Sequence, residues 1–194
     1  MQVRSLRATL ADACLVACLL AFPAPASSQE VTFSDLEGMT IEASFKRDQI
    51  NDAGAGRQVP AQVDGNWTVT VTAGTQIHFT YNATGHGAQG SKKAAPLGGT
   101  AVLNQSWKAT SSVQGELVWD FAGGTLSFVR TLPSGAYRAQ FAFARGSGGL
   151  TCAYRDAFAR EQGKGPVRLL SPYSGEMTTI ISTKVVTSSC KVSR

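Results

Sequence analysis

The chain has 194 residues, of which 43% are hydrophobic and 16% are charged. The charged fraction is too low for a disordered chain, and the length suits one domain with a sizeable core rather than two. Glycine is plentiful and Leu, Glu and Lys are sparse, a balance that favours strands and turns over helices.

The net charge differs between the two halves of the chain. Residues 27–100 carry five Lys and Arg against seven Asp and Glu, whereas residues 101–194 carry eleven against five. A basic half can indicate an anionic partner. The basic residues are spread singly, however, so we expect most of them on solvated outward faces. Nucleic acid is not expected as a partner, because alternation turns the aromatic rings inward, and base stacking needs exposed rings.

The N-terminus has the three parts of a secretion signal. Arg4 and Arg7 form a positive start, residues 13–22 form an apolar run, and Ala24-Pro25-Ala26 fits the small-x-small cleavage pattern. The apolar run is shorter than the roughly 20 residues that a membrane-spanning helix needs. We therefore expect cleavage at Ala24 to Ala26 and export to the periplasm or the medium.

Cleavage would remove residues 1–26 as a signal peptide and leave residues 27–194 as one β-rich domain without a transmembrane segment. An alternative is a lipoprotein, because Leu15-Val16-Ala17-Cys18 resembles a lipobox. The apolar run continues past Cys18, where a lipobox would end it. Ordinary cleavage is therefore the preferred prediction.

Two cysteines, Cys152 and Cys190, remain after cleavage. In an oxidising compartment such a pair predicts a disulfide. It would close a loop of about 38 residues and contribute on the order of 3–4 kcal/mol to stability. A metal pair is not expected, because no second Cys or His lies near either position.

Strands are predicted in the first half of the domain by alternation of apolar and polar residues. Residues 39–45 alternate, and residues 67–81 read as a hairpin with an aromatic inner face. The pair Asp64-Gly65 predicts a turn. The polar, glycine-rich segments 48–57 and 83–100 are predicted as loops, the second of them long and mobile.

Alternation continues in the second half. Strands are predicted at 116–121, 126–128, 137–144 and 177–186, with a last extended piece through Cys190 and a loop at 163–175. Residues 150–162 fit either an amphipathic helix or a strand. The strand is preferred because the strands predicted before it already form an antiparallel meander.

The predicted fold is an all-β antiparallel meander of about eight strands, with at most one short helix. Such a sheet manages its edges by closing into a barrel, lipocalin-like in shape, or by folding into a sandwich. The sequence does not decide between the barrel and the sandwich. The protein is expected to be a monomer. The inward aromatic residues are predicted to be Trp67, Phe79, Tyr81, Trp119, Phe121, Phe128, Tyr137 and Phe141.

Several segments carry a resemblance to a known group of proteins. They are Asp35-Leu-Glu-Gly-Met-Thr-Ile-Glu, Gly124-Thr-Leu-Ser-Phe-Val-Arg, Gly135-Ala-Tyr-Arg, Leu150-Thr-Cys and Ser188-Ser-Cys-Lys-Val. In this order they resemble small periplasmic or secreted β-rich proteins of rhizobia and related α-proteobacteria. The resemblance implies compartment and fold, and it implies no activity. The Asp-Leu-x-Gly opening is also similar to that of lipocalins, although Gly38 is followed by Met39-Thr40 rather than by their x-Trp.

The sequence contains no recognisable catalytic constellation. His78 and His86 have no further ligand nearby in sequence, so no metal site is expected. Glu116 and Asp120 would lie roughly 13 Å apart on one strand face, beyond the range of about 5–10 Å that glycoside hydrolysis uses. No Gly-x-Ser-x-Gly, phosphate loop or dinucleotide fingerprint occurs. We expect no enzyme activity and no cofactor.

Two hypotheses for function follow. The first is a binding module that holds a small apolar or amphipathic ligand, or a glycan, in the cell envelope. The second is a structural component of the envelope that meets a protein partner. A cavity inside the sheet would favour the first, and a solid core with an exposed patch would favour the second.

Overall fold

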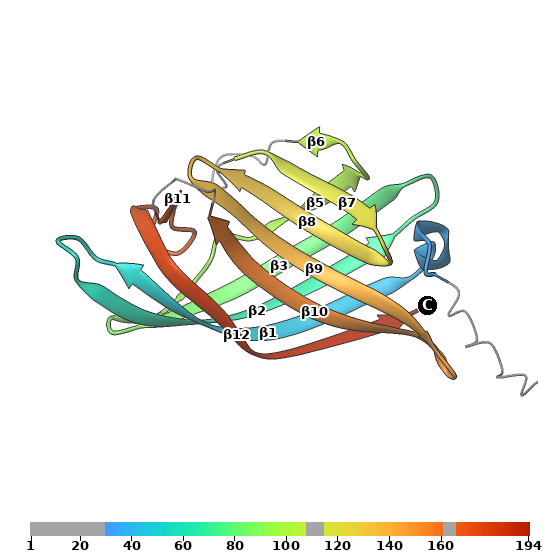
Figure 1. Ribbon diagram of the computed structural model, residues 1–194, viewed down its shortest axis with the longest axis horizontal. Coiled ribbons are helices and arrows are strands. Elements are labelled where there is room, and N and C mark those ends of the chain that lie inside the picture. The colour runs from blue at the N-terminus through green and yellow to red at the C-terminus, as the bar shows by residue number, and fades with distance from the viewer. Residues whose placement is uncertain (1–29, 108–114, 161–165) are drawn as a thin grey trace, which may run out of the picture.

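The computed structural model describes residues 30–107, 115–160 and 166–194, and in these ranges it has twelve strands and one short 3-10 helix, η1 (Phe33–Leu36) (Figure 1). The all-β prediction is confirmed. The signal segment, with Ala24, Ala26 and Cys18, lies outside the described residues. Among the described residues, no helix is long and apolar enough to span a membrane.

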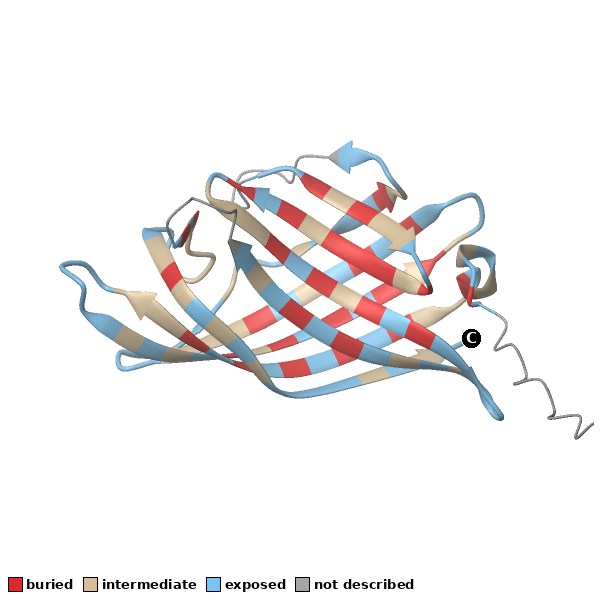
Figure 2. Ribbon diagram, viewed as in Figure 1, coloured by how far each residue is buried: buried red, intermediate tan, exposed pale blue. Residues whose placement is uncertain are grey.

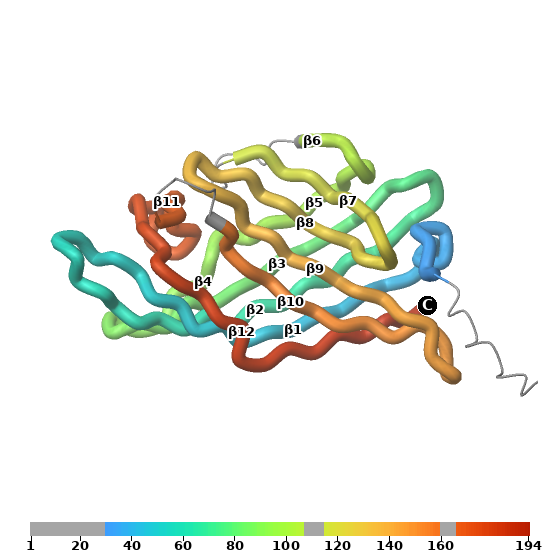
Figure 3. Tube along the Cα trace, in the orientation of Figure 1, coloured from blue at the N-terminus to red at the C-terminus, as the bar shows by residue number. Residues whose placement is uncertain are grey.

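The larger sheet has seven strands in the order β11-β12-β1-β2-β3-β4, and β5 also pairs with β3. Its strands are β1 (Thr40–Asp52), β2 (Gln58–Val71), β3 (Gln76–Gly87), β4 (Gly90–Lys93), β5 (Leu97–Val102), β11 (Val167–Leu170) and β12 (Met177–Ser193). Every pairing is antiparallel, and the β1–β12 register shifts at two places. Such irregularities bend a sheet, and this one curls into a half-barrel (Figure 3).

The second sheet has five strands and packs on the concave side of the first. It follows chain order as a meander of β6 (Ser106–Trp107), β7 (Leu117–Ala122), β8 (Thr125–Leu132), β9 (Gly135–Gly146) and β10 (Gly149–Arg160). The segment 150–162, for which both helix and strand were open, is a strand as far as residue 160, and residues 161 and 162 lie outside the description.

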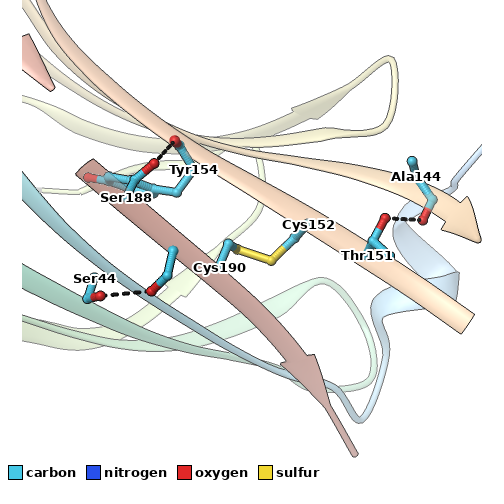
Figure 4. Close-up of a disulfide and its surroundings, with 8 residues drawn as sticks. Ser44, Ala144, Thr151, Cys152, Tyr154, Ser188 and Cys190 are labelled. Carbon is cyan, nitrogen blue, oxygen red and sulfur yellow. Dashed lines mark hydrogen bonds between the residues drawn. A yellow bond between two sulfur atoms is a disulfide. The ribbon is translucent and has the colours of Figure 1, made fainter. Parts of the chain in front are cut away.

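The two sheets meet at two seams, and neither seam is a continuous ladder within the described residues. At one seam the disulfide Cys152–Cys190 joins β10 to β12, with a Cα–Cα distance of 5.4 Å, and the Ser188 hydroxyl donates to the carbonyl of Tyr154 at 3.0 Å (Figure 4). At the other seam the Asn104 amide donates to the Trp119 carbonyl at 2.7 Å. A half-barrel with a second sheet is therefore present, and a closed barrel is not confirmed.

Burial alternates along the strands, as Figure 2 shows. The centre is an aromatic cluster in which the ring of Phe128 lies 5.1 Å from that of Trp67 and 5.3 Å from that of Trp119. All eight rings predicted to face inward belong to or pack against this core, although Tyr81 and Phe121 are only partly buried. One end of the sheet is covered by η1, whose Leu36 is fully buried.

Two predicted breaks in the first half are wrong. Asp64-Gly65 lies inside β2, and segment 48–57 contains the end of β1, so its turn is confined to residues 53–57. A Cβ atom on Gly65 would overlap the ring of Phe45. This glycine therefore makes room for an aromatic ring inside a strand rather than starting a turn.

The long mobile loop predicted at 83–100 is also wrong. This segment contains the end of β3, all of β4 and the start of β5. The Ala94 amide donates to the Ala83 carbonyl at 2.8 Å, and ladder hydrogen bonds hold the rest. Only a few apolar side chains, those of Ala83, Ala94 and Leu97, contact the core from this segment among the described residues. Backbone pairing supplies most of the remaining stabilisation, and the polar, glycine-rich composition therefore did not indicate these strands. Likewise, the loop predicted at 163–175 contains β11.

Candidate functional site

A cavity of about 440 Å³ opens at the end of the half-barrel that is opposite η1. It is lined by the later residues of β1 and β3 and by the earlier residues of β2, whereas η1 packs beside the first residues of β1. Strands of the second sheet contribute Phe128, Tyr137 and Phe158. This volume lies in the range that small-molecule sites in proteins occupy, about 300–1,000 Å³.

The cavity wall combines apolar and cationic side chains. Its apolar part includes Val63, Trp67, Leu97, Phe128, Leu169 and Ile180. Its cations are Arg47, Arg57, Lys92 and Arg130, and Asp52 is the one acid among the described lining residues. A wall of this kind suits a ligand that has both an apolar body and a negatively charged group.

The deepest polar contact is an ion pair between Arg47 on β1 and Asp156 on β10. Arg47 is 3% exposed and Asp156 is 9% exposed, and Nη1 of Arg47 lies 2.5 Å from Oδ2 of Asp156. The hydroxyls of Tyr137 and Tyr154 donate to the same carboxylate oxygen at 3.0 and 3.4 Å. Trp67 donates from Nε1 to the Tyr154 hydroxyl at 3.0 Å, so the network reaches the aromatic core.

The guanidinium of Arg47 also lies among aromatic faces. Its Cζ atom is 5.5 Å from the ring centre of Phe45, 5.7 Å from that of Tyr137 and 5.3 Å from that of Phe158. Cation–π attraction compensates part of the desolvation of this charge. Nε of Arg47 and Oδ1 of Asp156 are nevertheless buried without a hydrogen bond to any described residue.

Burial governs the protonation of the groups around the cavity. It raises the pKa of Asp156 above its ordinary value of 3.8, although Arg47 and the tyrosine hydroxyls oppose this shift. Burial also raises the pKa of Tyr137 well above 10.0 and lowers the pKa of Arg130 below its ordinary value of 12.5. Arginine keeps its charge at neutral pH, so both inner arginines remain cations.

Arg130 is the second buried arginine of the cavity wall. It is 8% exposed and lies on β8 directly opposite Tyr137 on β9. Arg47 contacts the same tyrosine ring from β1. Tyr137 therefore neighbours an arginine of each sheet, Arg130 in the β8–β9 ladder and Arg47 across the core.

The predicted site residues do not include Arg47, Arg130 or Asp156, although alternation places all three inward. Arg47 follows Ala43 and Phe45 at a spacing of two, Arg130 follows Phe128, and Asp156 follows Tyr154. Most basic residues that the structure describes are exposed, as expected, and Arg47 and Arg130 are the buried exceptions. Three ionisable residues stand at positions that alternation assigns to the inward, apolar face of a strand. This was the signal that could have identified the site.

The two histidines lie apart from the buried network. His78 is exposed, as predicted, and its Nδ1 is 2.7 Å from the Thr100 hydroxyl. His86 lies near the end of β3 rather than in a loop, with Nε2 3.3 Å from Oδ2 of Asp64 and Nδ1 2.7 Å from Oγ of Ser91. Among the described residues, no group of three His, Cys, Asp or Glu side chains could hold a metal ion.

A second depression lies on the outer face of the larger sheet. Its polar lining includes Ser44, Asn66, Asn82 and Ser189. Among the described lining residues the one aromatic ring is that of Phe45, which is 3% exposed. A sugar ring would find hydroxyl and amide partners there but no exposed aromatic face on which to stack. The inner cavity, with its rings and buried cations, is the stronger candidate site.

Comparison of the chain with protein-family models, with curated protein sequences and with solved structures gives no match.

Proposed function

We propose that this chain is an exported, non-enzymatic binding protein that holds a small amphipathic ligand in the inner cavity. The single observation that supports this most is the 440 Å³ cavity between the two sheets, whose wall combines aromatic rings with two buried arginines. Catalysis is not proposed. Asp156, the buried acid of the network, is paired with Arg47 and lies behind the cavity wall.

The alternative is a structural envelope protein without a small-molecule ligand. A solid core and an exposed apolar patch would favour it. Among the described residues, the large hydrophobic side chains that are exposed are Met177 and Val186. These are two separate positions on one strand, and scattered single residues of this kind need no partner.

A neutral fluorescent probe, N-phenyl-1-naphthylamine, tests ligand binding. We expect its fluorescence to rise saturably with the wild-type protein. Ala61→Phe places a ring in the cavity and should weaken this binding at least about tenfold. Ala142→Phe is the matched control, since Ala142 is exposed on the outer face of β9, and it should bind the probe like the wild type. Absent binding, or equal binding by both variants, would overturn the proposal.

The proposed export is tested on the protein purified from its native host. The denatured mass should correspond to cleavage after Ala26, with no lipid on Cys18 and with two hydrogens fewer than the reduced chain. A mass that retains residues 1–26 would contradict export by signal cleavage. The native mass, measured in parallel, should exceed the denatured mass by that of a bound small molecule.

A further inference from the structure

The charge of the cavity wall restricts the class of ligand. Four Lys and Arg side chains line the cavity against one Asp among its described residues. Asp156, a second acid behind the wall, offsets the charge of Arg47. The remaining charges of the described lining residues are still three cations against one acid. A positive potential in a low-dielectric cavity attracts anions and disfavours cations.

The cations occupy two depths of the cavity. Arg57 and Lys92 are exposed at its mouth, whereas Arg47 and Arg130 are buried. A guanidinium presents five N–H donors, so an arginine that already has a partner can still donate to a ligand anion. The Nε atom of Arg47, buried without a hydrogen bond to a described residue, is one such donor beside the cavity.

The apolar residues indicate where the rest of the ligand would lie. Val59, Val63, Leu169 and Ile180 line the same cavity from β2, β11 and β12. A chain or ring system extending from the arginines would contact these side chains. Burial of its apolar surface would then add to the affinity.

We propose that the ligand is an amphipathic anion whose acidic head group lies at Arg130 and Arg47 and whose apolar part lies against the β2, β11 and β12 side chains. This inference rests on the proposed function and specifies its ligand class. The head group is an oxyanion, a carboxylate or a phosphate monoester, because a guanidinium pairs with either through parallel hydrogen bonds.

Displacement of N-phenyl-1-naphthylamine by three twelve-carbon ligands tests this proposal. Dodecanoate and dodecyl phosphate carry the anion, and dodecanol is the neutral equivalent. We expect the stronger anion to displace the probe at about tenfold lower concentration than dodecanol, because a charge-assisted hydrogen bond contributes that much or more. The better of the two anions identifies the head group. Equal displacement by all three ligands would overturn the anion proposal and leave probe binding, and thus the proposed function, intact.

Substitutions of Arg130 test whether the preference for an anionic ligand over dodecanol depends on this buried arginine. Arg130→Gln should reduce the ratio of anion to dodecanol affinity about tenfold while N-phenyl-1-naphthylamine still binds, and Arg130→Lys should retain part of the ratio. Arg138→Gln is the matched control, because Arg138 is exposed on β9 and its loss changes the net charge equally. Similar loss of the ratio in the Arg138 and Arg130 variants would show a general charge effect and contradict the proposed head-group site. If Arg130→Gln does not fold, the comparison of Arg130→Lys with Arg138→Gln decides.

Discussion

Arg47 marks the point on β1 where the inward face of the strand changes from apolar to polar. Before it come Ile41, Ala43 and Phe45, all buried, and after it comes buried Gln49. The same strand therefore supplies the aromatic core at one end and the cavity wall at the other. A charge at this position is stable because Asp156 and three aromatic rings surround it.

We expect the Arg47–Asp156 pair to be strongly coupled. Asp156→Asn would leave the guanidinium buried beside a neutral amide and should lower the free energy of unfolding by about 3–5 kcal/mol. The double variant Arg47→Met with Asp156→Asn should recover much of this loss, because it removes both charges. Urea unfolding of the wild type, both single variants and the double variant measures the coupling.

The exposed pair of Arg145 and Asp35 is the control for this experiment. Its atoms lie 2.7 Å apart, but the Arg145 side chain is 36% exposed. Arg145→Gln should change the free energy of unfolding by no more than about 1 kcal/mol. Additive effects in the buried pair would show that burial does not couple these two charges.

Gly65 is the second residue whose role depends on packing. Because its Cβ position overlaps the Phe45 ring, Gly65→Ala should lower the free energy of unfolding by about 1–3 kcal/mol. Gly87→Ala is the control, since an added Cβ there has no atom within 4 Å. Unfolding curves of equal midpoint for the two variants would refute the close approach of ring and backbone.

At the scale of elements, alternation was a reliable guide wherever one face of a strand is apolar. The strands around Trp67, Trp119 and Phe141 were predicted for this reason, and they hold the core. The Asp64-Gly65 pair was misread because a glycine that admits a ring and a glycine that turns the chain look alike in sequence. Segment 83–100 was predicted as a loop because its strands are held mainly by backbone pairing and have too few apolar side chains to show alternation.

The candidate site was less predictable than the fold. The rings of Trp67, Phe128 and Tyr137 were predicted to face inward, but the sequence could not show that space remains beside them. A cavity depends on how far two sheets separate, and that separation is set by all the facing side chains together. The pairing of Arg47 with Asp156 also spans 109 positions, a distance at which local patterns carry no information.

The disulfide is the element-scale contact with the clearest energetic consequence. It connects β10 to β12 across a seam without ladder pairing, and 38 positions separate its cysteines. Cys152→Ser should lower the free energy of unfolding by about 3–4 kcal/mol under oxidising conditions. The double variant with Cys190→Ser should match the single variant, and the reductant dithiothreitol should have no effect on either. Equal stability of Cys152→Ser and the oxidised wild type would contradict a stabilising role.

At the scale of the whole molecule, the cavity belongs to both sheets. Val63 and Tyr81 reach it from the larger sheet, and Phe128 and Tyr137 reach it from the smaller one. A ligand that contacts both sheets stabilises them against separation. The outer depression, in contrast, is lined by residues of the larger sheet and of the segment after β4.

Because both sheets line the inner cavity, a ligand bound there should stabilise both of them against unfolding. N-phenyl-1-naphthylamine at 100 times its dissociation constant should raise the free energy of unfolding by about 2.7 kcal/mol, because it binds the folded state alone. Amide hydrogen exchange should slow in β2 and β3 of the larger sheet and also in β8 and β9 of the smaller one, since each pair contributes to the wall. Ala61→Phe, which should bind the probe at least about tenfold more weakly, should gain no more than about 1.4 kcal/mol at the same probe concentration, with correspondingly smaller slowing of exchange. Slower exchange confined to the larger sheet would place the probe in the outer depression and contradict a ligand held between the two sheets.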